Sequence, residues 1–144
     1  MPIHNQSNAK KGFMEQHQNN SKLSLWSGRI LKVLVAVFLL FDAVMKIIKH
    51  PIYIKGTEEL GLPASSVQPL GIYLFLSTVL YIIPRTAVLG GLLLTAYLGG
   101  AAAITFAASN GAHPYMFPIV FAAVMWAAEY LKNTKIRSAI PLTK

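Results

Sequence analysis

The sequence predicts an all-α protein built as a bundle of four transmembrane helices, with both termini in the cytoplasm and a disordered polar tail before the first helix. Three observations predict this class. Hydrophobic residues make up 54% of the 144 residues and charged residues only 12%, whereas a soluble domain carries about 25% charged residues. Four long apolar runs follow one another, separated by helix breakers. The basic residues gather at the two ends and between these runs.

Residues 1–24 precede the first apolar run and are predicted to form the disordered cytoplasmic tail. They are rich in Asn and Gln and show no apolar periodicity. Such a segment cannot bury enough apolar surface to offset the entropy of ordering. The net charge of +8 does not indicate a nucleic-acid partner, because the basic residues form no stripe interleaved with aromatic residues.

The apolar runs have the length and composition of membrane spans. A helix needs about 20 apolar residues to cross ~30 Å of hydrocarbon. The run over 86–108 holds 23 residues without a charge, and a helix of a soluble protein needs a polar face. Residues 133–144 are predicted to form a cytoplasmic C-terminal tail. The transmembrane domain, 25–132, is predicted to contain spans over about 25–48, 67–83, 86–108 and 114–131.

The distribution of lysine and arginine predicts the orientation of the bundle. Cytoplasmic connections carry an excess of these residues over translocated ones. Ten of the 13 lie before or at the start of the first span, at Arg85, or after the fourth span. The other three, Lys46, Lys49 and Lys55, lie around the first connection. Both termini are therefore expected in the cytoplasm of the cell.

Polar residues inside the spans are the candidates for a site, because an ionisable group at the centre of a bilayer costs roughly 2.5–3.5 kcal/mol on insertion scales. Asp42 and Lys46 are four residues apart and share a helix face. Tyr73 and Tyr97 lie at a similar predicted depth. These four residues predict either a polar pocket for a small ligand or a quinone headgroup, or a structural ion pair that tethers helices.

Glu129 is the other acidic residue in a predicted span. Arg85 lies at a similar depth in the second connection. We expect these two residues to form a structural ion pair that joins the second and third spans to the fourth. The sequence contains no cysteine, which excludes disulfides and thiolate chemistry. No metal site is expected, because no group of residues has the spacing of metal ligands.

The third span carries a row of small residues spaced by four. Small residues let helices approach closely in lipid. The row predicts either packing against a neighbouring span or the face of a homodimer, and Gly99→Leu is expected to disrupt the bundle. Its members are Ala87, Gly91, Thr95, Gly99, Ala103 and Ala107.

Several strings of this sequence, taken in order, resemble the DoxX-like family. The most specific are YIIPRTAVLG over 81–90 and GGA over 99–101; LFDAVMKI over 40–47, HP at 50–51 and LGLP over 60–63 precede them. The similarity covers roughly residues 28–132. It implies a small four-helix integral membrane protein, multi-pass, of a bacterial inner membrane.

The resemblance implies little chemistry. The wider family is named for a subunit associated with thiosulfate:quinone oxidoreduction, and other relatives resemble receptor-assembly factors. We expect a non-catalytic membrane subunit or assembly partner, which binds another protein or a second copy of itself within the lipid bilayer. A quinone-linked redox subunit and a small transporter are the alternatives. No catalytic constellation indicates an enzyme.

Overall fold

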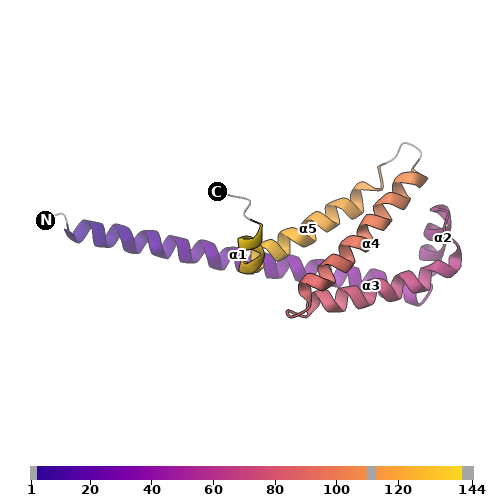
Figure 1. The fold of residues 1–144 in the computed structure, drawn as a ribbon, viewed down its shortest axis with the longest axis horizontal. Helices are drawn as coiled ribbons and strands as arrows, with labels where there is room; N and C mark the ends of the chain where they lie inside the picture. The colour runs from indigo at the N-terminus through magenta and orange to yellow at the C-terminus, as the bar shows by residue number, and fades with distance from the viewer. Residues whose placement is uncertain (1–2, 110–112, 141–144) are drawn as a thin grey trace.

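The computed structural model describes residues 3–109 and 113–140, and within them it contains helices and no strand. Four long helices pack together, and the chain passes through a short helix between the first and the second of them (Figure 1). In chain order the elements are α1 (Ile3–Ile47), α2 (Pro51–Glu59), the short 3₁₀ helix η1 (Ala64–Ser66), α3 (Val67–Ile82), α4 (Ala87–Ala108), α5 (Met116–Lys132) and α6 (Thr134–Ala139).

The four long helices form a closed ring. The second half of α1 packs against α3 and α5, and α4 packs against the same two helices from the other side. One end of this bundle carries α2 and the other carries α6 (Figure 1); we call them the α2 end and the α6 end. The core between the helices consists of Val35, Leu39, Ala43, Leu74, Tyr81, Leu94 and Met125.

The predicted spans agree closely with the helices. The spans over 67–83, 86–108 and 114–131 correspond to α3, α4 and α5, and the span over 25–48 is the second half of α1. Judged by length and composition, two helical segments could cross a membrane: Ala64–Ile82, with 19 residues, and Ala87–Ala108, with 22. The third predicted connection, 109–113, lies mostly outside the described residues.

The N-terminal segment differs from its prediction. The sequence predicts disorder over 1–24, whereas α1 begins at Ile3 and continues without interruption to Ile47. The side chains over 5–23 are exposed, and this part of α1 projects away from the bundle (Figure 1). The segment contains no proline between Ile3 and Ile47. Once the packed half of a helix has formed, adding further residues avoids the cost of nucleation.

Large apolar side chains cover the outside of the bundle. Every long helix exposes several of them; Val37 of α1, for example, is 60% exposed, and Phe117 of α5 is 59% exposed. Soluble monomers rarely expose contiguous apolar patches of more than a few hundred Å², so a surface of this kind suits contact with lipid or with another protein. The exposed apolar residues of the four packed helices include Val33, Val37, Phe41, Ile72, Leu76, Leu89, Leu92, Phe117 and Val120.

Three glycines let the helices approach one another. An added Cβ would lie 2.2 Å from the backbone nitrogen of Tyr81 at Gly90, and 2.7 Å from the Cβ of Lys46 at Gly71. At Gly28 it would lie 3.1 Å from the carbonyl oxygen of Ala128. These contacts close the interfaces of α3 with α4, of α1 with α3, and of α1 with α5.

The row of small residues on α4 packs only over its first half. Ala87 and Gly91 are buried, whereas Gly99, Ala103 and Ala107 are exposed. An α-helix turns by about 100° per residue, so five steps of four residues rotate the row by about 200° around the helix. The prediction of one continuous packing face was therefore wrong, and the expected clash of Gly99→Leu has no basis, because an added Cβ there meets nothing within 4 Å.

Candidate functional site

The α2 end of the bundle contains the predicted Asp42 and Lys46 pair. Lys46 Nζ donates a hydrogen bond to Asp42 Oδ2 at 2.6 Å and a second to the Tyr97 hydroxyl at 2.7 Å. The charged side chains are 17% and 20% exposed for Lys46 and Asp42. The second bond joins α1 to α4, which lie diagonally across the ring, so one ammonium group holds together helices that do not adjoin each other.

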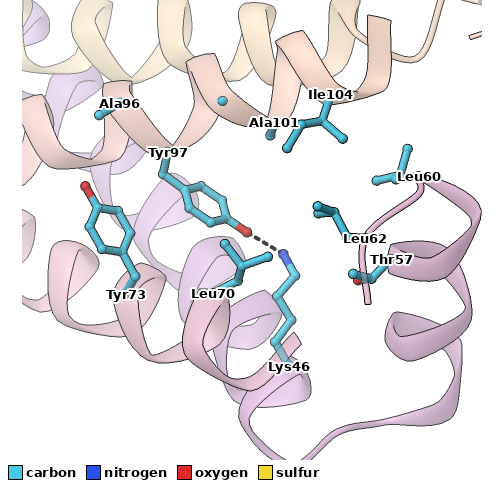
Figure 2. Close-up of a pocket in the computed structure, with 11 residues that line it drawn as sticks. Lys46, Thr57, Leu60, Leu62, Leu70, Tyr73, Ala96, Tyr97, Ala101 and Ile104 are labelled. Carbon is cyan, nitrogen blue, oxygen red and sulfur yellow. Dashed lines mark hydrogen bonds between the residues drawn. The ribbon is translucent and has the colours of Figure 1, made fainter. Parts of the chain in front are cut away.

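A cavity of about 410 Å³ opens beside this ammonium group. Lys46 and Tyr97 supply its polar atoms on one side, and Figure 2 shows the ammonium nitrogen between the Tyr97 hydroxyl and the residues of the α2–α3 connection. Most of the remaining wall is apolar. Its residues include Leu60, Leu62, Leu70, Ala96, Ala101 and Ile104, together with the single hydroxyl of Thr57.

Tyr73 lies at this cavity but not in the hydrogen-bond group. Its ring stacks against that of Tyr97, with centroids 6.1 Å apart and an angle of 22° between the planes. Its hydroxyl donates to the carbonyl oxygen of Leu93 at 3.1 Å and points away from Lys46 (Figure 2). The structure therefore brings together three of the four predicted residues through polar contacts, and Tyr73 contributes only its ring.

Helix α2 contributes Thr57 to the wall of the cavity. The chain reverses after α1 at Lys49, which has φ 56°, and Pro51 occupies the first turn of α2, where its missing N–H is tolerated. The Tyr53 ring centroid lies 5.8 Å from Lys46 Nζ, within the range of a cation–π contact. Burial and the nearby Asp42 carboxylate raise the pKa of the Tyr53 hydroxyl, so this group stays neutral near pH 7.

A second ion pair lies at the α6 end, and its basic member is not the predicted one. Glu129 Oε1 lies 2.6 Å from Lys32 Nζ, with side chains 3% and 8% exposed. The same ammonium lies 4.4 Å from the centroid of the Tyr81 ring. The prediction of a pair between Glu129 and Arg85 was wrong: Arg85 is exposed in the turn between α3 and α4, while Lys32 approaches from α1.

Gly28 explains why Lys32 reaches Glu129. The absence of a side chain at Gly28 brings α1 against the last turn of α5, beside Ala128 and Lys132. Lys32 is four residues further along α1 and so lies on nearly the same face. The depth of a residue along a span can be estimated from the sequence. Which helix lies beside it depends on close approaches such as the one at Gly28, and an isolated glycine in a sequence does not reveal them.

Two further polar contacts join the long helices near the core. Trp126 Nε1 donates to Thr95 Oγ1 at 2.8 Å, and the hydroxyl of the fully buried Tyr81 donates to the carbonyl oxygen of Met125 at 3.3 Å. The Tyr81 bond joins α3 to α5, the second diagonal of the ring. Within the described residues no buried side-chain nitrogen or oxygen lacks a hydrogen-bond partner, and no group of three or more His, Asp or Glu could hold a metal.

The comparisons with known proteins assign the family. Residues 30–128, more than half of the chain, match the DoxX-like family, and the chain belongs to it. No curated protein and no solved structure matches the chain. Family membership and the two apolar helical segments together indicate a membrane protein.

Proposed function

We propose that the protein is a four-span membrane protein of a bacterial inner membrane, with both termini in the cytoplasm. The apolar outer surface of all four long helices supports this arrangement, because lipid is the solvent that such a surface suits. Helix α5 has 17 residues, near the lower limit for crossing a bilayer. The second half of α1 contains Lys32, Asp42 and Lys46, and each of these charges has a partner of opposite sign.

The charge distribution in the structure supports the orientation. The α6 end carries Arg29, Arg85, Lys132, Lys135 and Arg137, while the α2 end carries three lysines, Lys46, Lys49 and Lys55, together with three acidic residues, Asp42, Glu58 and Glu59. Cytoplasmic ends of membrane helices are enriched in lysine and arginine. The proposed orientation therefore places the α6 end at the cytoplasmic side of the membrane. The exposed first half of α1 then extends into the cytoplasm.

Within that arrangement the protein acts as a non-catalytic subunit or assembly partner. The observation that carries this role is the exposed second half of the small-residue row on α4, at Gly99, Ala103 and Ala107. Helices associate in lipid by close packing at small residues. These three residues are exposed, and an added Cβ at Gly99 would meet nothing within 4 Å, so the face is free to receive another helix. The partner is a second chain, either a different protein or another copy of this one.

Native mass spectrometry of the protein extracted in mild detergent tests this role. We expect a complex whose mass exceeds that of the 15.7 kDa chain. Ala103→Phe should dissociate it, because the new ring blocks close approach. Leu92→Phe, at another exposed position of the same helix, should leave it intact. A monomer in the unmodified protein, or equal dissociation by both variants, would contradict the role.

The cavity at Lys46 favours a quinone-linked membrane subunit as a second candidate. A lysine ammonium has three N–H donors, and two bonds use two of them. The Tyr97 hydroxyl accepts from Lys46 and keeps its own proton to donate. Two donors beside apolar walls fit the carbonyl oxygen and ring of a quinone, which would supply two-electron redox chemistry when bound.

Extraction and mass spectrometry of bound lipophilic molecules tests this candidate. We expect a prenylquinone to copurify with the unmodified protein and to be lost in Lys46→Met. Lys49→Met removes the same charge at an exposed position just beyond α1 and should retain the quinone. A quinone content that is the same in the two variants would exclude the cavity as its site.

A further inference from the structure

A second cavity, of about 550 Å³, lies at the α6 end between α1 and the end of α3. Its position separates it from the cavity at Lys46, which lies at the opposite end of the bundle. Basic side chains line one end of it and apolar side chains line the rest. The residues that define it are Arg29, Lys32 and Lys132 at the basic end, and Val33, Val37 and Ile82 along the apolar walls.

The basic end of this cavity carries a positive charge that the protein does not neutralise. Lys32 is paired with Glu129, so Arg29 and Lys132 supply the net charge. Of the five acidic residues, three lie at the α2 end. The other two are Glu129, which is the partner of Lys32, and Glu15, which precedes Arg29 by 14 residues and so lies about 21 Å away along the helix. Glu129 lies beside this position, but Lys32 balances its charge, so an anion there would meet the net positive charge of Arg29 and Lys132.

The cavity as a whole has the depth of one lipid leaflet. The whole groove follows α1 from the basic Arg29 to Leu40, about 16 Å at 1.5 Å per residue, and its apolar part from Val33 to Leu40 covers about 10 Å of this length. The length of the whole groove is close to half of the ~30 Å hydrocarbon thickness of a bilayer. Val33, Val37 and Ile82 are 59%, 60% and 42% exposed, so the groove opens sideways along its length and an acyl chain can enter from the bilayer.

We propose that this groove binds one anionic phospholipid, with its phosphate between Arg29 and Lys132 and an acyl chain along Val33 and Val37. The proposal rests on the membrane-spanning arrangement proposed above, which places Arg29 and Lys132 at the cytoplasmic interface. An arginine guanidinium binds phosphate through two parallel hydrogen bonds. Basic pockets between membrane helices on the cytoplasmic side bind anionic headgroups in this manner. Phosphatidylcholine serves as the comparison lipid, because it has the same acyl chains as the anionic phospholipid but a zwitterionic headgroup without net charge.

Native mass spectrometry with added lipid tests the proposal. The full chain in mild detergent is titrated with phosphatidylglycerol or phosphatidylcholine of the same acyl chains. We expect phosphatidylglycerol to bind more tightly, and Arg29→Gln with Lys132→Gln to weaken it by roughly 30-fold, equivalent to about 2 kcal/mol at 1.4 kcal/mol per tenfold. Lys10→Gln with Lys11→Gln removes the same charge from the projecting part of α1 and should leave the affinity unchanged. The single variant Arg29→Gln should keep the helix packing intact, because the Arg29 side chain is exposed. It should show part of the loss of affinity for phosphatidylglycerol.

Each outcome bears on the proposal. Equal affinity for the two lipids, or equal loss in the two double variants, would overturn it. Displacement of bound phosphatidylglycerol by millimolar inorganic phosphate would show that the groove recognises phosphate without the acyl chain and would also overturn it. Recovery of the chain from the soluble fraction would instead contradict the proposed membrane-spanning function, and this result is visible before any lipid is added.

Discussion

Lys32 of α1 and Glu129 of α5 form a buried ion pair, with Nζ and Oε1 2.6 Å apart. Removing one partner strands the other charge, which typically costs about 3–5 kcal/mol, whereas replacing both with apolar residues of similar volume is often neutral. We therefore expect Lys32→Met or Glu129→Leu alone to lower the thermal stability in detergent strongly. The double variant should recover most of that loss. Losses that simply add would show that the two charges do not interact.

The bond between Lys46 and Tyr97 gives a matched comparison of two tyrosines at one cavity. Tyr97→Phe removes an acceptor from a charged donor, and a hydrogen bond to a charged group contributes about 1.5–3 kcal/mol. Tyr73→Phe removes a neutral bond to a backbone carbonyl, which contributes about 0.5–1.5 kcal/mol. Thermal unfolding of the two variants in the same detergent should rank Tyr97→Phe as the more destabilised. The reverse order would contradict the assigned contacts.

Variants of Asp42 and Lys46 can distinguish whether this ion pair only stabilises the bundle or also forms part of a ligand site. If the pair is only structural, Asp42→Asn or Lys46→Met alone should be harmful, and Asp42→Leu with Lys46→Met should restore a stable bundle together with wild-type quinone or partner binding. If the pair belongs to a ligand site, the double variant should fold and yet lose the bound molecule. Thermal stability and the mass of bound ligand, measured on the same three preparations, distinguish these results.

Two glycines of α4 should respond oppositely to the same substitution. At Gly90 a new Cβ would lie 2.2 Å from the Tyr81 backbone nitrogen, so Gly90→Ala must push α3 and α4 apart, and overpacking of this kind costs about 1–3 kcal/mol. At Gly99 the space is open, so Gly99→Ala should stabilise the helix by about 0.5–1 kcal/mol. Melting temperatures that fall equally in both variants would contradict the packing described for α4.

The positions of the helices could be predicted from the sequence because they follow from local properties. Apolar runs and breakers placed α3 and α4 within one residue of their bounds, and the four-residue spacing of Asp42 and Lys46 gave their contact. The partner of Glu129 could not be predicted, because it depends on which helix Gly28 brings close. Disorder was predicted before residue 25 from composition alone, which does not include the effect of a helix that continues from a packed half.

The row of small residues shows a second limit of the same kind. Its spacing of four predicts one face, but the rotation of the helix leaves Gly99 and Ala103 exposed, whereas Gly91 lies near Trp126 of α5. Gly90, which lies outside the row, makes the closest contact on α4. Close approach between helices is a property of two surfaces, and the sequence of one helix contains only half of the information.

The proposed function requires four membrane spans rather than two, and the absence of cysteine from the sequence allows a direct measurement of their number. Single cysteines are introduced at the exposed positions Glu58, in α2, and Arg85, in the turn between α3 and α4. Intact cells are then treated with a membrane-impermeant maleimide. Four spans predict that Glu58→Cys is labelled from outside and that Arg85→Cys is labelled only after permeabilisation. If α3 and α4 alone crossed the membrane with the termini inside, Arg85→Cys would be labelled and Glu58→Cys protected, which would contradict the account.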